Sequence, residues 1–262
     1  MAQTERIDLL LVARGLAASR SQAQRLVMAG KVRADGAVVP KPSAKVRANA
    51  DLSVAAGPRF VSRGGEKLEA ALSAFPIAVE RIVAADVGAS TGGFTDCLLQ
   101  RGARRVYAID VGQGILHWKL REDPRVVVME NTNARLLASL PETVGLVTVD
   151  ASFISLRLLL PRLAEWLAED GDLVALVKPQ FEAGKGVVSR GGVVREPEVH
   201  RDVLHQVVHA ALAEALAPVG LIRSPLLGPK GNVEFLLWCR KGGGPGDPAA
   251  LVDAAVPPPA SA

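Results

Sequence analysis

The sequence of 262 residues has few features of a secreted or membrane protein. Its two cysteines, Cys97 and Cys239, are too few for a disulfide framework or a multi-cysteine zinc site. Its uncharged apolar runs are far shorter than the roughly 20 residues that cross a bilayer. The first residues also lack the basic, apolar and small-residue succession of a signal peptide. Because 49% of the residues are hydrophobic and 22% are charged, we expect a folded cytoplasmic protein without a membrane span.

Positive charge is concentrated at the start of the chain. Residues 1–64 contain 11 Lys and Arg against 4 acids, a net charge of +7, whereas the remainder has 20 against 23, a net charge of −3. A basic segment ahead of a nearly neutral body predicts an anionic partner that is held mainly by the front segment. A small, well-solvated domain that happens to be rich in arginine is the alternative reading.

Residues 1–55 predict a small unit of two helices and a hairpin. Helices are predicted at about 5–14 and 21–30, and the sequence ADGA (34–37) is a turn signal between two short strands. A third strand is expected at 52–54. The basic residues that we expect to contact the anionic partner are Arg6, Arg20, Arg25, Lys31 and Arg33.

Strand-like and helix-like runs alternate beyond a linker at 56–65. A helix starts near Glu66, and others are predicted at about 156–168 and 197–217. Strands are predicted at 82–87, 105–110, 126–129, 146–150, 173–177 and 232–239. Nearly continuous apolar strands are typical of a parallel sheet with helices on both faces. We therefore predict an α/β, Rossmann-like domain over 66–241 behind a small α+β domain, followed by a disordered tail over 242–262 that is rich in Gly, Pro and Ala.

A glycine-rich turn follows the first strand of this predicted sheet. The sequence DVGASTGGFT (86–95) leads into a helix, in the context where open α/β sheets bind ligands. Ser90 replaces the middle glycine of the dinucleotide fingerprint, and Asp86 suits a cationic or zwitterionic ligand better than a pyrophosphate. Asp110 ends the second strand, where a carboxylate can bind both hydroxyls of a ribose. Together these features fit S-adenosylmethionine, and a purely structural cluster of turn glycines is the alternative.

The residues that we expect to bind this cofactor share the turn and the two following strand ends. They are Asp86, Gly88, Ser90, Gly92, Gly93, Phe94, Asp110, Asn131 and Asn133. The two asparagines are expected beside the adenine, although a simple turn accounts for them equally well.

Four ionisable residues lie at positions that suit a single cleft. The sequence has only 9 lysines against 22 arginines, so a surface cation is usually an arginine. A lysine at a strand end or after a turn is therefore a candidate for a specific role. Lys178 and Asp150 each end an apolar strand, Lys67 follows a turn at 62–65, and Glu234 lies in an apolar segment. Each residue also has a purely structural explanation: the lysines can be solvated, Asp150 can cap a loop, and Glu234 can lie on an exposed strand face. Brought together, two lysines and two acids suit methylation of a hydroxyl, with Lys178 as the general base.

Other methyl-transfer chemistries leave signatures that this sequence lacks. Asp150 leads into Ala151 and Ser152 instead of the Pro-Pro-aromatic run of amine-directed nucleic-acid methylases. Neither cysteine lies where a carbon-directed methylase needs its nucleophile. His205 and His209 have helical spacing but no neighbouring acidic motif, so we expect no metal site.

Seven segments resemble known families. The sequences RIDLL (6–10), SRSQA (19–23) and AGKV (29–32) resemble a small RNA-binding module named after a small-subunit ribosomal protein. The order of FVSRGGEKL (60–68), the glycine-rich turn, VDASFIS (149–155) and LVKPQFE (176–182) resembles the TlyA-type, or haemolysin A-like, rRNA 2′-O-methyltransferases. This resemblance implies a Lys-Asp-Lys-Glu catalytic set shared with FtsJ-type enzymes, which falls on Lys67, Asp150, Lys178 and Glu234. It also implies that the acceptor is a cytidine ribose in rRNA.

The sequence thus predicts an S-adenosylmethionine-dependent rRNA (cytidine-2′-O)-methyltransferase whose partners are ribosomal RNA or ribosomal subunits. Two alternatives remain at this point. One is a membrane-active, haemolysin-like protein, and the other is an rRNA-binding assembly factor that keeps the sheet without catalysis.

Overall fold

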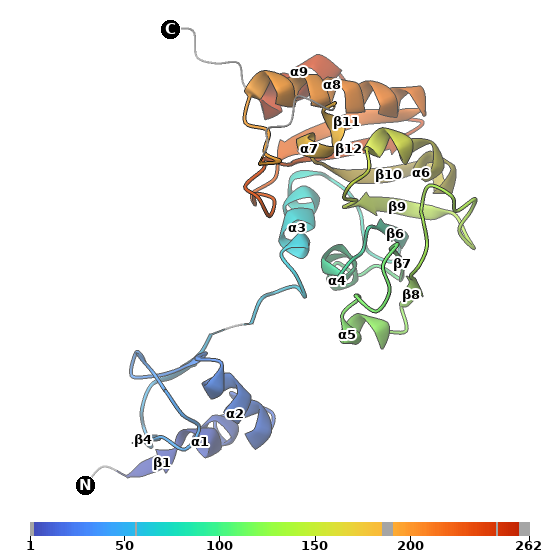
Figure 1. The fold of residues 1–262 in the computed structure, drawn as a ribbon. Helices are drawn as coiled ribbons and strands as arrows, with labels where there is room; N and C mark the ends of the chain where they lie inside the picture. The colour runs from blue at the N-terminus through green and yellow to red at the C-terminus, as the bar shows by residue number, and fades with distance from the viewer. Residues whose placement is uncertain (1–2, 56, 185–190, 245, 257–262) are drawn as a thin grey trace, which may run out of the picture. The chain divides into compact units, whose positions relative to one another are not determined.

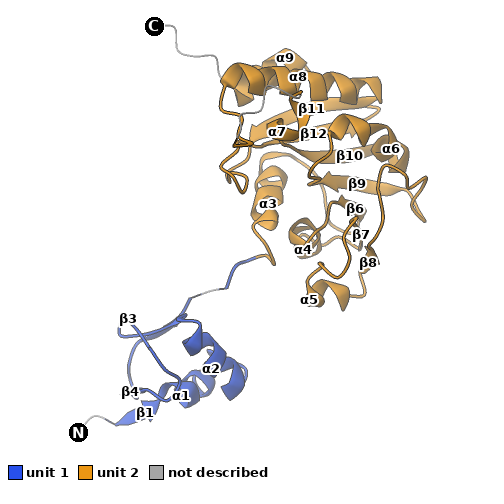
Figure 2. Cartoon of the chain, viewed as in Figure 1, with its two compact units in different colours: residues 1–59 blue, residues 60–262 orange. Residues whose placement is uncertain are grey.

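The structure is a computed structural model that describes residues 3–55, 57–184, 191–244 and 246–256. The chain forms two compact units, residues 1–59 and residues 60–262 (Figure 2). The boundary falls inside the predicted linker, because Phe60 is buried in the core of the second unit.

The first unit contains the predicted helices and hairpin. Its elements are β1 (Thr4–Arg6), α1 (Ile7–Ala13), α2 (Arg20–Met28), β2 (Val32–Ala34), β3 (Ala37–Val38), β4 (Lys45–Arg47) and β5 (Leu52–Val54). Strands β3, β2 and β5 form one antiparallel sheet, and the unpredicted strands β1 and β4 pair as a second one. Ser19 caps α2 by accepting a hydrogen bond from the Gln22 amide. Ile7, Leu11 and Val32 are fully buried between the helices and the sheet.

The second unit is built on a seven-stranded sheet. Its strands are β6 (Val83–Val87), β7 (Arg105–Ile109), β8 (Val126–Met129), β9 (Val144–Val149), β10 (Leu167–Val177), β11 (Leu216–Arg223) and β12 (Phe235–Lys241). The order across the sheet is β11-β12-β10-β9-β6-β7-β8. Strands β6 to β10 run parallel, and β12 is antiparallel to both of its neighbours. The sheet is therefore the doubly wound α/β arrangement that the alternating sequence predicts.

Helices cover both faces of this sheet (Figure 1). The helices are α3 (Gly64–Ala74), α4 (Gly93–Gln100), α5 (Trp118–Arg121), the 3-10 turn η1 (Leu156–Leu158), α6 (Leu160–Trp166), α7 (Pro179–Glu182), α8 (Pro197–Ala213) and α9 (Pro248–Ala255). Alternate residues of each strand enter two cores: Ala84 packs with α3 and α4, whereas its neighbour Ala85 packs with α6 and α8. Burial on both faces explains why the strands have continuous apolar sequences.

The C-terminal part differs from the sequence prediction in two places. The helix predicted to reach residue 217 ends at Ala213, and strand β11 follows it. Pro218 and Gly220 disfavour a central strand, but β11 lies at the sheet edge, where its pairing with β12 shifts register between these two residues. The tail over 242–262 is not disordered throughout, because α9 caps itself through Asp247 and buries Val252 against the α8 side of the sheet. Residues 257–262 lie outside the described residues.

Two features are absent from the described residues. No helix there is long and apolar enough to span a bilayer. No group of three or more His, Cys, Asp or Glu side chains is arranged for a metal ion within the same residues.

Candidate active site

Two adjoining cavities lie at the carboxyl ends of the central parallel strands. Strand β6 pairs with β7 on one side and β9 on the other, so the chain reverses its direction of progress across the sheet at this point. Ligands of open α/β sheets bind at such a position. The cavities have volumes of about 660 and about 340 Å³. Five residues line both cavities and therefore mark where they meet: Gly88, Ser90, Asp150, Ser152 and Phe153.

The first ion pair of the larger cavity joins Lys67 of α3 to Glu234, which directly precedes β12. The Lys67 Nζ atom lies 2.5 Å from Glu234 Oε2, and their side chains are 11% and 1% exposed. Glu234 Oε1 has no hydrogen-bond partner among the described residues. Since a buried charge is costly without a partner, each residue of this pair stabilises the other at its position in the cavity wall.

The second ion pair joins Lys178 to Asp150. Lys178 Nζ lies 2.6 Å from Asp150 Oδ1 and donates a hydrogen bond of 2.8 Å to Ser152 Oγ. Both residues follow the ends of neighbouring strands, because β10 and β9 pair in parallel with Ala175 opposite Val149. Lys178 is 9% and Asp150 24% exposed, so the lysine is the more enclosed member of the pair. The structure thus places all four predicted catalytic residues on the wall of one cavity.

The glycine-rich turn forms the wall between the two cavities. Gly88 has a φ of +79°, and a Cβ there would collide with the Asp150 carbonyl group. Gly93 begins α4 and would collide with the Ser62 side chain if it carried a Cβ. These close approaches require glycine and bring the turn against both β9 and the start of α3. Gly93 and Phe94, two of the residues predicted to bind the cofactor, line the larger cavity.

The smaller cavity carries the groups expected of a nucleoside site. Asp110 and Asn133 line it, together with the apolar side chains of Val111 and Ile154. Asp110 accepts hydrogen bonds of 2.7 Å from the Ser90 amide and 2.7 Å from the Gly112 amide. Its carboxylate is therefore held at the end of β7 by backbone donors on two loops.

Three of the predicted cofactor contacts line neither cavity. Asp86 is fully buried beneath the turn and accepts hydrogen bonds from Thr95 and Thr148 at 2.7 and 3.3 Å. Burial raises the pKa of this carboxyl group to about 7, so it does not present a fixed charge to a ligand. Gly92 is needed for packing, because a Cβ there would collide with the Leu120 side chain. Asn131 is exposed in a turn with a φ of +51°.

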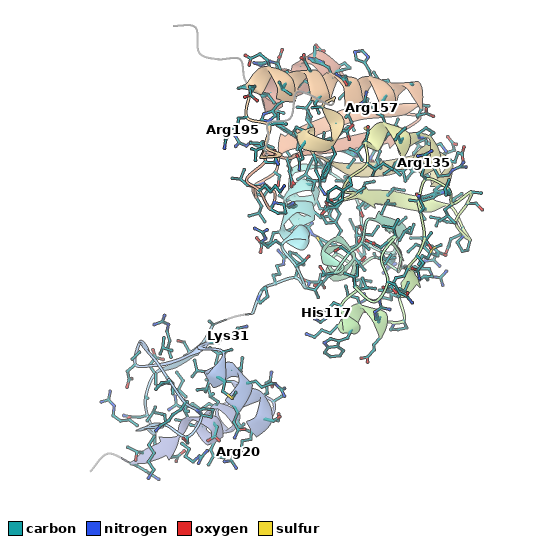
Figure 3. The ribbon with its side chains drawn as sticks, in the orientation of Figure 1. Arg20, Lys31, His117, Arg135, Arg157 and Arg195 are labelled. Atoms are coloured by element: carbon teal, nitrogen blue, oxygen red, sulfur yellow. The ribbon has the colours of Figure 1, made fainter. Side chains whose placement is uncertain are left out.

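The predicted RNA-contacting cations all lie in the first unit. Arg6 and Arg20 both bind the buried carboxylate of Asp8, at 2.9 and 3.0 Å, while their own side chains are 38% and 54% exposed. Arg20 is labelled in Figure 3. Gln24 donates a further hydrogen bond of 3.1 Å to Asp8. The Arg6 hydrogen bonds hold the pKa of Asp8 well below its usual range. The remaining predicted cations are Arg25 and Arg33, which are exposed, and Lys31, which is half-buried.

Sequence reasoning assigned no role to several residues of the site. Ser152 holds Lys178, Asn232 and Lys230 line the larger cavity, and Phe153 packs against Phe181 with ring centroids 5.1 Å apart. Phe153 is 90% exposed and has a φ of +64°. Its place three residues after Asp150 was the available signal in the sequence. The positive φ seen in the structure adds to it, since a non-glycine residue in this conformation often marks a functional site.

Comparisons with known proteins agree with this geometry. Residues 60–241 match the model of the FtsJ-like methyltransferases, and residues 5–52 match the S4 domain. The chain is 51% identical over 246 residues to the 16S/23S rRNA (cytidine-2′-O)-methyltransferase TlyA of Mycobacterium tuberculosis, covering 92% of this chain and 91% of that protein. It is 39% identical over 234 residues to Hemolysin A of Brachyspira hyodysenteriae, covering 88% of this chain and 98% of that protein.

A solved structure also matches nearly the whole chain. A Streptococcus thermophilus protein that is named as a hemolysin superposes with a TM-score of 0.74 at 43% identity, covering 98% of this chain and 95% of that chain. The matched family model spans more than half of the sequence and contains all four residues of the two ion pairs. The chain therefore belongs to the FtsJ-like methyltransferase family and carries an S4 domain ahead of its methyltransferase domain.

Proposed function

We propose that this protein transfers a methyl group from S-adenosylmethionine to the ribose 2′-hydroxyl of a cytidine in ribosomal RNA, in the cytoplasm. The observation that carries the proposal is the pair of lysine–carboxylate contacts in one cavity that adjoins a nucleoside-sized cavity. The name of the Mycobacterium tuberculosis relative supports the choice of acceptor, since it specifies the 2′-oxygen of cytidine in 16S and 23S rRNA.

The residues of the smaller cavity fit the methyl donor. Asp110 would bind the ribose hydroxyls, Asn133 would lie beside the adenine, and Val111 and Ile154 offer apolar contact to its faces. Gly88, at the shared wall, lets the Asp150 backbone pack directly against the turn beside the expected donor. When bound, S-adenosylmethionine supplies an electrophilic methyl carbon on a sulfonium, so no metal or covalent enzyme intermediate is required.

Lys178 would act as the general base. A ribose hydroxyl is too weakly acidic to attack unaided near neutral pH, and it needs a base within hydrogen-bonding reach. As the hydroxyl oxygen forms its bond to the methyl carbon, the carbon–sulfur bond breaks and the hydroxyl proton passes to the neutral amine of Lys178. Asp150 then stabilises the resulting ammonium at 2.6 Å, and Ser152 keeps the amine directed into the cavity.

Lys67 and Glu234 would position the acceptor. Their ion pair holds the Lys67 side chain on the wall of the same cavity that Lys178 lines. The Lys67 ammonium can donate a hydrogen bond to the sugar and hold the 2′-oxygen in line with the methyl carbon, which is the condition for rapid transfer.

The S4 domain would supply affinity for the RNA. Arginine and lysine contacts to phosphates give strong binding that depends little on sequence. Folded RNA is recognised largely by shape, which suits a small basic platform such as the surface around Arg6 and Arg20.

Incubation with labelled donor tests the proposal. Ribosomal subunits from cells that lack this gene are mixed with the protein and S-adenosylmethionine labelled in its methyl group, and the rRNA is digested to nucleosides. We expect the label in 2′-O-methylcytidine with the wild type and no label with Lys178→Ala. Label on a base, or equal transfer by Lys178→Ala, would refute the reaction or the base assignment respectively.

A further inference from the structure

The larger cavity has more cations than acids on its wall. Six charged side chains line it: Arg63, Lys67, Lys178, Lys230, Asp150 and Glu234. The two acids are each matched with one lysine, as described above. Within the described parts of the chain, Arg63 and Lys230 form no ion pair, and both are exposed. Even with Lys178 in the neutral form that accepts the proton, the three cations Arg63, Lys67 and Lys230 outnumber the two acids, so the cavity carries an excess of positive charge.

Lys230 is presented by a loop with a defined shape. The loop joins β11 to β12, and within it the Gly228 amide donates to the Asn232 carbonyl group at 2.9 Å. The Asn232 side chain is buried, and it accepts from the Val194 amide at 2.9 Å while donating to the Gly192 carbonyl group at 2.9 Å. These hydrogen bonds connect the loop to the segment that contains Gly192 and Val194. They hold Lys230 at the edge of the cavity, beside Gly192.

We infer that Lys230 binds a phosphodiester group of the RNA strand directly next to the acceptor ribose. This inference rests on the proposed function. Two phosphodiester groups are attached to the acceptor nucleotide, so its 2′-oxygen cannot reach Lys178 without bringing negative charge to the rim of the cavity. A lysine ammonium suits this role as a point charge that binds phosphate oxygens without requiring a fixed angle.

The charges around the cavity favour a phosphodiester group of the acceptor strand as the anion that Lys230 binds, over a carboxylate group or a side chain of another protein. Asp150 and Glu234 contact the inner lysines, so the exposed cations Arg63 and Lys230 are the ones left to bind an anion outside the cavity. The carboxylate of the methyl donor is the other anion expected in these cavities, so the test separates the two.

Salt dependence of RNA binding provides that test. Full-length Lys230→Ala and Lys230→Arg are compared with Lys241→Ala, which removes the same charge at the opposite end of β12. Binding to ribosomal subunits from cells that lack the gene is measured over a series of salt concentrations. We expect the slope of log affinity against log salt to fall by about 0.7–0.9 for Lys230→Ala and to stay unchanged for the other two variants. We also expect the KM for subunits to rise about ten-fold, with kcat within about two-fold of the wild type.

A slope for Lys230→Ala equal to that of Lys241→Ala would overturn the role of Lys230. If calorimetric binding of S-adenosylhomocysteine were also weaker in Lys230→Ala, the anion bound by Lys230 would be the donor carboxylate. Failure of the proposed function is distinguishable, because the wild type would then bind the subunits without methylating any ribose.

Discussion

Lys67 and Glu234 are 167 residues apart in the sequence, and their side chains meet at 2.5 Å in the larger cavity. The start of α3 supplies the lysine, and the loop before β12 supplies the acid. This buried pair joins the helix that precedes the sheet to the loop before strand β12, so the same contact contributes to folding and to the proposed site.

Removal of Glu234 should destabilise the protein. Glu234→Ala leaves the Lys67 ammonium buried without a partner, which is expected to lower the free energy of unfolding by about 3–5 kcal/mol. Lys67→Met/Glu234→Leu should recover much of this loss, because no unpaired charge is then buried. Urea denaturation of the wild type and both variants measures the difference. A loss below about 0.5 kcal/mol for Glu234→Ala would show that the pair is not buried in solution.

Replacement of Lys178 should abolish transfer and leave binding intact. Lys178→Arg keeps a cation beside Asp150 but cannot accept a proton at neutral pH, so we expect kcat to fall by about 10²–10⁴-fold. Calorimetry with S-adenosylhomocysteine should give an affinity close to that of the wild type. Near-normal turnover by Lys178→Arg would show that another group accepts the hydroxyl proton of the ribose.

The buried carboxyl group of Asp86 should make stability depend on pH. Burial raises its pKa from 3.8 to about 7 in the folded protein. Between these values the folded state binds a proton that the unfolded chain lacks, so this group makes the protein less stable as the pH rises. Asp86→Asn keeps an acceptor for Thr95 and removes the titration. The free energy of unfolding of the variant minus that of the wild type should therefore be larger at about pH 8 than at about pH 5, as measured by urea denaturation. An equal difference at both pH values would contradict this assignment.

Asp8 should organise the RNA-contacting surface of the S4 domain. Its buried carboxylate binds Arg6 and Arg20, so Asp8→Asn should release both side chains and weaken RNA binding by about 10–100-fold. Asp35→Asn is the matched control, because Asp35 pairs with Arg47 on the exposed surface of the same unit. Both variants are compared by binding to ribosomal subunits at one fixed salt concentration. Equal affinities would mean that Asp8 has only a structural role.

The sequence was sufficient to predict the central strands and the position of the site. Continuous apolar runs ended at Asp150 and Lys178, and the parallel pairing of β9 with β10 brought both ends together. Strand β11 was not predictable in the same way, because Pro218 and Gly220 weaken its local signal and only its edge position makes them tolerable. Helix α9 was also missed, since its short apolar stripe acquires meaning only when Val252 packs on the sheet.

Sequence patterns predicted which residue types form the site better than they predicted their contacts. Asp86 belongs to the glycine-rich turn in sequence, but the alternation of β6 directs its side chain beneath the turn to Thr95 and Thr148. Lys230 gave no signal of its own, because its place at the cavity depends on the buried Asn232 side chain that shapes its loop.

Ribose-methylation mapping of rRNA tests the central claim most directly. Ribosomal RNA is compared from cells with the gene, without it, and without it but expressing Lys178→Ala. We predict at least one cytidine that resists alkaline cleavage at its 3′ side only when the wild-type protein is present. An identical ribose-methylation pattern in all three would contradict the account.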